Sequence, residues 1–296
     1  MNILWAASYT FMKWGFEYLS PMHLLFARFL ISVIILYSVS WRLVRGMPSK
    51  VLLRCILLGA VIAVSHGFSV IGVDKSHAMD GALIYALEPI FAIIWARILL
   101  NEKMDMIRWI SLIFALIGFA ILSNITSRDI FSNLTFIGNI LILIGAMADG
   151  VFSPVAKPAS EHYNARVIMA TSLFFATIFL LPFALTTPLK AGSFSWQAIV
   201  SVLYLAVICT SIGWTLWVFF LKKYPVNVMV ITVFLQPVFG PLISHFTIGE
   251  QISARIWFGG GMILAAVLLA TIKQKYNFYS KRFDNAEIFP YNPSCN

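Results

Sequence analysis

Charge is what this sequence lacks most. Asp, Glu, Lys and Arg make up 11% of its 296 residues, whereas soluble domains carry about 25%. Cysteine is scarce too, and Cys55, Cys209 and Cys295 show neither paired nor metal-ligand spacing, which argues against a disulfide framework or a zinc site. The sequence also has no GxxxxGK phosphate-binding loop. We therefore expect no cofactor, and we do not expect ATP to be the direct energy source.

Apolar residues fill the sequence instead. They account for 60% of it, and the mean hydropathy is +0.87. A run of about 18 or more apolar residues is long enough to cross a bilayer as a helix, and such runs recur along the chain. We therefore predict an all-α integral membrane protein with ten transmembrane helices, near residues 2–18, 21–43, 51–73, 79–100, 107–124, 134–155, 165–187, 196–221, 226–247 and 255–273.

The positive charges set the orientation of these spans. A net charge of +9 could suggest nucleic acid, but the Lys and Arg residues sit in short clusters between apolar runs, so no nucleic-acid partner is expected. With the N-terminus inside, fifteen of the 21 Lys and Arg residues fall on the cytoplasmic side, four fall outside and two lie within spans. The excess of basic residues on cytoplasmic loops predicts that both termini are cytoplasmic.

Two stretches of the sequence repeat each other. "LEPIFAIIWARILLNEK" begins at position 87 and "LQPVFGPLISHFTIGEQ" at position 235, an offset of 148 residues. At this offset Pro89 matches Pro237 and Glu102 matches Glu250. Proline and glutamate are scarce in this composition, so their coincidence indicates an internal repeat. We predict a helix kink at each of the two prolines.

The repeat unit contains five spans, because the two stretches fall in spans four and nine. Five is odd, so the second copy must cross the membrane in the opposite sense to the first. The predicted units are residues 1–127 and 128–273, followed by a polar cytoplasmic tail over 274–296. Inverted repeats with kinked helices are typical of secondary transporters, whose substrate site lies near the midplane between the repeats.

The chain resembles the drug/metabolite transporter superfamily in its ten-helix EamA branch. The residues that carry this resemblance are "ILWAASYTFMKWG", "LLFARFL", "ALEPIFAIIWARILLNE", "FALIGFAIL" and "FLQPVFGPLISHFTIGEQ", within a region from about Ile3 to Ile272. The resemblance implies a metabolite or drug carrier with two EamA units and a central cavity. It also implies amino acids or related solutes among the cargoes.

Polar residues within the spans are the candidate site. Asp, Lys or Arg at the middle of a membrane helix costs about 2.5–3.5 kcal/mol, so such residues should face a cavity or a partner. This rule selects five residues for closer inspection: Lys13, Arg28, His66, Glu88 and Asp149.

Glu88 is the most informative of the five. It shares a helix face with Tyr85, which is therefore a candidate substrate-binding residue as well. Pro89 cannot donate a backbone hydrogen bond, so it leaves the Tyr85 carbonyl free. A carboxylate and a free carbonyl one turn apart could bind a cation, a substrate ammonium group or a proton. Alternatively, Arg28 or Lys13 neutralises Glu88 and only the proline matters.

Asp149 and His66 are each open to two interpretations. Gly145 lies one turn before Asp149 and would leave room beside the acid in a cavity. The alternative for Asp149 is a hydrogen bond to another helix, with a partner such as Ser8. His66 could relay protons, but a neutral imidazole bonded to a neighbouring helix is the favoured interpretation.

The remaining candidates are basic, aromatic or amide side chains. Lys13 and Arg28 could attract an anionic group such as a carboxylate, or could be structural. The aromatic residues of spans one and eight could line a cavity and stack on a flat solute, although a position in the interfacial belt is the expected explanation for at least half of them. Gln236 takes the place of Glu88 in the second repeat. These candidates are Trp5, Tyr9, Trp214, Trp217 and Gln236.

The leading functional prediction is a secondary transporter of the cell (inner) membrane, not an enzyme. Its expected partners are a small-molecule substrate, the lipid bilayer and, as one candidate coupling ion, the proton. We expect a monomer or weak dimer. A channel or a membrane-embedded enzyme is the alternative, but a channel does not need an inverted repeat and no paired His and Asp cluster for catalysis is visible.

Overall fold

The computed structural model describes residues 1–44, 47–100, 106–123, 133–190, 195–223, 233 and 235–269. This part of the chain is helical and contains no strand. Its helices are α1 (Asn2–Phe16), α2 (Pro21–Val44), α3 (Ser49–Lys75), α4 (Ala78–Tyr85), α5 (Glu88–Leu100), α6 (Met106–Leu122), α7 (Leu134–Asp149), α8 (Phe152–His162), α9 (Ala165–Thr186), α10 (Trp196–Leu203), the π-helix η1 (Tyr204–Trp214), α11 (Thr215–Lys223), α13 (Leu235–Ile248) and a final helix, Ala254–Leu269.

Each of the ten predicted spans contains at least one of these helices. Five helical stretches are long and apolar enough to cross a membrane by themselves: Pro21–Ser40, Ser49–Lys75, Leu134–Ser160, Ala165–Thr186 and Trp196–Lys223. The predicted boundary between the two units at 127–128, Glu102 and the tail over 274–296 lie outside the described residues.

Two spans that we expected to be continuous helices are broken. Span four separates into α4 and α5 at residues 86–87, and span six separates into α7 and α8 at residues 150–151. Pro89 is the second residue of α5, in the first turn, where a backbone N–H has no hydrogen-bond acceptor within the helix. The lack of an N–H on proline therefore costs no hydrogen bond there. The proline therefore accompanies a break and not a mere kink. Pro237 is the third residue of α13, and the residues just before that helix are mostly outside the described part.

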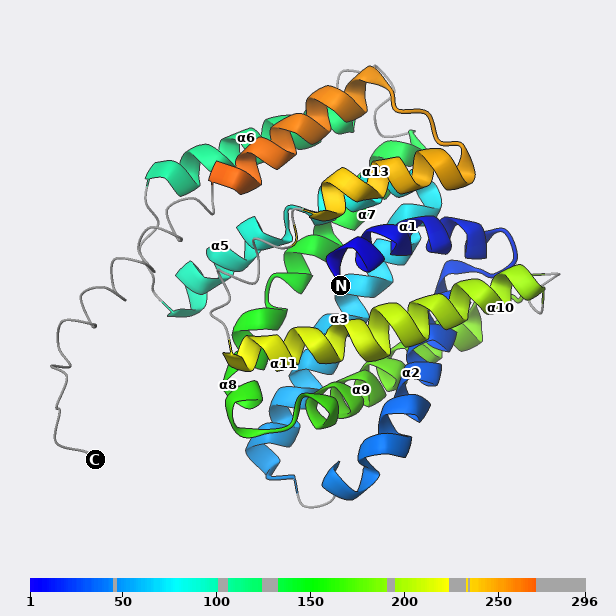
Figure 1. Ribbon diagram of the computed structural model, residues 1–296, viewed down its shortest axis with the longest axis vertical. Coiled ribbons are helices and arrows are strands. Elements are labelled where there is room, and N and C mark those ends of the chain that lie inside the picture. Colours follow the sequence, from blue (N-terminus) through cyan, green and yellow to red (C-terminus); the bar gives the residue numbers. More distant parts are fainter. Residues whose placement is uncertain are drawn as a thin grey trace, which may run out of the picture.

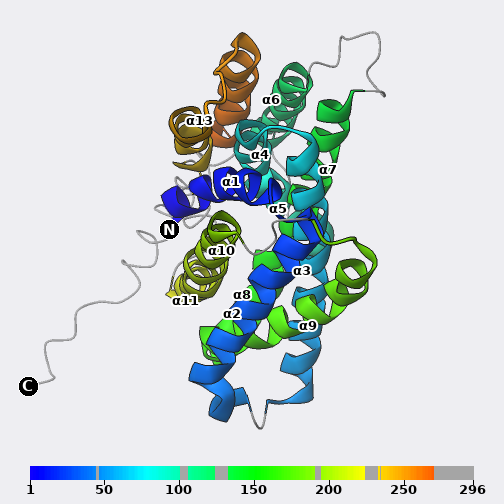
Figure 2. The same cartoon turned by 90° about the vertical axis from the view of Figure 1, so that its right-hand side faces the viewer.

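Small residues let several helices approach closely. A Cβ atom on Gly72 of α3 would lie 2.6 Å from the Gly138 carbonyl oxygen of α7. A Cβ on Gly118 of α6 would lie 2.9 Å from the Gly259 carbonyl oxygen of the last helix. Figures 1 and 2 show α6 and this last helix, in orange, side by side at one end of the molecule. Close packing of this kind is how helices associate in lipid.

The helix contacts relate the two halves of the chain. Helix α3 of span three packs on α7 of span six. Five spans along the chain, the equivalent helices also pack together, since α10 and η1 of span eight contact α1 of span one. Likewise α3–α9 corresponds to η1–α2, and α1–α13 corresponds to the contacts of α7 with α4 and α5. This exchange of partners supports a two-fold repeat. The opposite membrane orientation of the two halves stays a prediction.

Candidate functional site

A cavity lies among helices from both halves of the chain. It encloses about 790 Å³ when the open solvent at its mouth is included. The structure brings nine of the sequence-predicted candidates together around it, besides Trp217. They are Trp5, Tyr9, Arg28, His66, Tyr85, Glu88, Asp149, Trp214 and Gln236.

Both acids of the cavity stand at helix breaks. Glu88 is the first residue of α5, and Asp149 is the last residue of α7. The two breaks lie against each other, because a Cβ on Gly150 would come within 2.8 Å of the Ala92 amide nitrogen. The positive end of the α5 dipole favours a carboxylate at Glu88. Interrupted helices that end at a binding site are a feature of transporter folds.

The hydrogen bonds of Asp149 come from helices α3 and α4. Tyr85 donates its hydroxyl to one carboxylate oxygen at 3.1 Å, and Ser65 donates to the other at 3.4 Å. The suggested partner Ser8 instead donates to the Trp5 carbonyl at 2.6 Å. The expected room beside Gly145 is also absent, since a Cβ there would lie 2.3 Å from the Ser69 hydroxyl. Gly145 serves the close contact of α7 with α3.

The Glu88 carboxylate, unlike that of Asp149, is not held by hydrogen bonds from the described residues. It faces the cavity. Neither Arg28 nor Lys13 forms an ion pair with it in this part of the chain. Glu88 is therefore the acid of the cavity whose oxygens stay available to a solute.

Arg28 belongs to the cavity wall and Lys13 does not. The buried Arg28 donates its Nε–H to the Thr210 hydroxyl at 2.6 Å, and its guanidinium carbon lies 5.8 Å from the Trp214 ring centre. Thr210 lies in the π-helix, a form of helix that occurs frequently at functional sites. Lys13 donates to the Asp74 carbonyl at 3.0 Å, away from the cavity, as the structural interpretation predicts.

His66 has a free ring nitrogen, contrary to our expectation of a hydrogen bond there. Its Nε2 atom is buried and has no hydrogen-bond partner among the described residues. The ring packs on Trp214 with 4.7 Å between centroids and lies 6.3 Å from that of Tyr85. A buried polar atom without a hydrogen bond destabilises the protein. A solute that forms a hydrogen bond with this nitrogen would remove that cost and would bind more tightly.

The four aromatic candidates of spans one and eight all line the cavity, as the first of the two interpretations predicts. Trp5 and Trp217 lie 5.6 Å apart between ring centroids, and the Trp5 indole donates to the Cys209 carbonyl at 2.8 Å. The Tyr9 ring lies 6.1 Å from that of Tyr85. Gln236 donates to the Asn2 side chain at 3.2 Å and is held by it.

Sequence reasoning missed part of the cavity wall. The missed residues are apolar or small and carry no cost in a membrane that would single them out. Ser153, for example, accepts a hydrogen bond from the Trp217 indole at 3.4 Å. The missed residues are Ser8, Met12, Ser69, Phe152, Ser153 and Val233.

Comparison with known proteins identifies the family. The EamA-like transporter family matches residues 1–124 and again residues 136–272. The chain belongs to the EamA-like transporter family. It is thus a multi-pass membrane protein of a transporter family whose fold has ten helices.

Similar proteins come from archaea and bacteria. An uncharacterised transporter of Archaeoglobus fulgidus is 23% identical over 276 residues, which cover 92% of this chain and 95% of that one. The uncharacterised transporter YetK of Bacillus subtilis is 25% identical over 84% of this chain and 77% of its own. A probable terminal-alkyne amino-acid exporter of Streptantibioticus cattleyicolor is 21% identical over 65% of this chain and 63% of its own.

A solved structure shares the fold of this family member. It is a crystal structure of a protein that is 15% identical to this chain. The two match with a TM-score of 0.67, over 93% of this chain and 95% of the other. At this identity the likeness shows the fold alone.

Proposed function

We propose that this family member is a secondary transporter that moves a small organic solute across the membrane by alternating access. The observation that carries the proposal is the cavity, which is walled by helices of both halves and holds an acid at each of two helix breaks. A site between two repeats can be reached from either side when the repeats rock against each other.

The chemistry of the wall favours a solute with a flat or apolar body and a charged head. Trp5, Trp214 and Trp217 offer ring faces, whereas Glu88 offers free carboxylate oxygens. An amino acid or a related metabolite has these properties, and some drugs have them too. The name of the Streptantibioticus relative, a probable amino-acid exporter, agrees with this choice. Glu88 binds the positive group of the cargo or a proton.

An untargeted comparison of solutes tests the proposal. Cells with and without the protein should differ in the accumulation of at least one small organic solute. In proteoliposomes its flux should saturate and should be accelerated by unlabelled solute on the opposite side. Flux that never saturates would indicate a channel instead, and chemical conversion of the solute would indicate an enzyme.

We also propose that both termini are cytoplasmic and that the protein resides in the cell (inner) membrane as a monomer or weak dimer. The charge count across the ten spans supports this topology. Reporter fusions at Lys50 and Lys103 should read cytoplasmic, and a fusion at Lys190 should read external. An external reading at Lys50 would refute the topology.

A further inference from the structure

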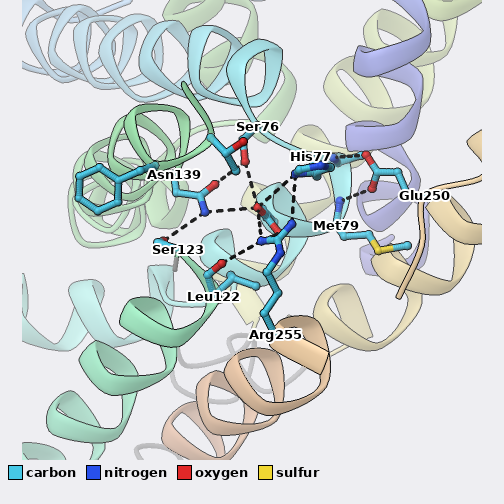
Figure 3. A network of polar contacts seen from close by, with 12 residues as sticks. Ser76, His77, Met79, Leu122, Ser123, Asn139, Glu250 and Arg255 are labelled. Carbon is cyan, nitrogen blue, oxygen red and sulfur yellow. Dashed lines mark hydrogen bonds and ion pairs between the residues drawn. The ribbon is translucent and has the colours of Figure 1, made fainter. Parts of the chain in front are cut away.

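A buried ion pair lies at the end of the molecule that the charge count places outside. Asp80, in the first turn of α4, is fully buried. The Nη1 atom of Arg255 contacts both of its carboxylate oxygens, at 3.0 and 2.9 Å. Ser76 donates to the same carboxylate at 3.1 Å, and Asn139 donates to it at 3.3 Å (Figure 3). This arrangement provides enough donors to stabilise a buried negative charge.

Arg255 also connects α4 to other helices. It belongs to the final helix, Ala254–Leu269, and its guanidinium donates to the Leu122 carbonyl at the end of α6 at 2.8 Å. Its other terminal nitrogen lies 3.2 Å from Nδ1 of His77 (Figure 3). One side chain of the second half thereby binds the outer ends of two helices of the first half.

Glu250 makes a second connection of the same kind. Its two carboxylate oxygens accept hydrogen bonds from the backbone amides of Ala78 and Met79, at 2.8 and 3.0 Å (Figure 3). These amides open α4 and have no partner within the helix, so the acid caps the helix and complements its dipole. We call Asp80, Arg255 and Glu250 the outer latch.

The latch lies next to a close contact between α1, α4 and α13. A Cβ on Gly240 of α13 would lie 2.3 Å from the Ala82 side chain of α4, and one on Gly81 would lie 2.8 Å from the Tyr9 ring. Thr10 of α1 shares a hydrogen bond of 2.9 Å with Ser244 of α13. Tyr9 itself lines the cavity. This contact therefore joins the cavity wall at Tyr9 to α4, the helix whose first turn carries the latch.

We propose that the outer latch holds this end of the transporter closed and must break before the cavity can open to the outside. Alternating access requires α4, in the first half, to part from α13 and the final helix, in the second half, so the inference rests on the proposed function. The latch suits this role because water can replace its polar contacts when the end opens, whereas separated apolar surfaces have no such replacement. The closed and open arrangements of the outer end can thus differ by only a few polar contacts.

Cysteine accessibility tests the latch without any knowledge of the cargo. In a background with Cys55, Cys209 and Cys295 replaced by alanine, Met12→Cys places one thiol in the cavity wall near its outer side. The probe is the membrane-impermeant reagent 2-(trimethylammonium)ethyl methanethiosulfonate. Added to intact cells it reaches the outer face of the protein, and added to inverted vesicles it reaches the cytoplasmic face. Asp80→Asn and Arg255→Gln should each speed outside labelling about tenfold or more. The double variant, which leaves no unpaired buried charge, should do the same, and inside labelling should not rise.

Two further variants keep the test sharp if the buried pair is needed for folding. Glu250→Gln leaves the pair intact and removes only the charge at the α4 start, so it should give a smaller rise in outside labelling, about two- to fivefold. Lys75→Gln removes an exposed charge at the same end and should change nothing. Unchanged outside labelling in all latch variants would overturn the proposal. So would an equal rise on both sides, because the latch residues would then only hold the fold together. The labelling test uses no cargo, so its outcomes can be interpreted even if the solute screen identifies no transported solute.

Discussion

Glu88→Gln should reduce transport of an identified cargo about 10- to 100-fold while leaving the protein folded. The amide keeps the size of the side chain but removes the charge that faces the cavity. A hydrogen bond to a charged group is worth about 1.5–3 kcal/mol, and each 1.4 kcal/mol is about a factor of ten. If Glu88 also binds a coupling proton, the pH dependence of the rate should flatten. Initial rates in proteoliposomes at several pH values measure both effects.

The same substitution elsewhere provides the control. Glu17→Gln removes an equivalent charge from the exposed end of α1 and should transport normally. Asp149→Asn changes an acid that Tyr85 and Ser65 already hold, so its effect should fall more on cavity geometry than on cargo charge. Normal rates and a normal pH profile in Glu88→Gln would make Glu88 a structural residue.

The fold was largely predictable because lipid imposes simple rules. A span needs a length of apolar residues and internal hydrogen bonds, so hydropathy alone located a helix in every predicted span. The helix breaks were harder to predict. Pro89 indicated a disturbance in span four, but whether a chain bends or separates there depends on the helices that receive the freed groups. The break after Asp149 depends on the contact of Gly150 with Ala92, which no local pattern encodes.

The cavity was predictable to the extent that its residues are polar. The cost of a charge in lipid singled out Arg28, Glu88 and Asp149, and the cavity contains all three. Apolar wall residues such as Met12 carry no such cost, and sequence cannot separate them from lipid-facing ones. The residues of the outer latch are charged, but their charge did not single them out either. Asp80 and Arg255 lie at span ends, where a charge is ordinary, and only the fold brings them together.

The break in span four leads to a second large effect. Pro89→Ala restores an amide that can donate to the Tyr85 carbonyl, so α4 and α5 can join into one helix. The break lies beside Glu88 and at the contact with the second break at Gly150. A continuous helix would shift the acid, and under the proposed alternating access it would stiffen the junction between α4 and α5. We expect transport to fall about tenfold, equivalent to about 1.4 kcal/mol, with thermal stability in detergent unchanged or raised.

Pro182→Ala is the matched control for this prediction. Pro182 lies within the unbroken helix α9, is exposed and is not part of the cavity wall. Restoring its amide should raise the stability of α9 without altering transport, since α9 is continuous at Pro182. If both variants slow transport equally, the effect belongs to general stiffening of the protein. If Pro89→Ala transports at the normal rate and its thermal stability is raised, α4 and α5 have joined without harm. The break would then serve to place Glu88 at a helix end and not to let the halves move.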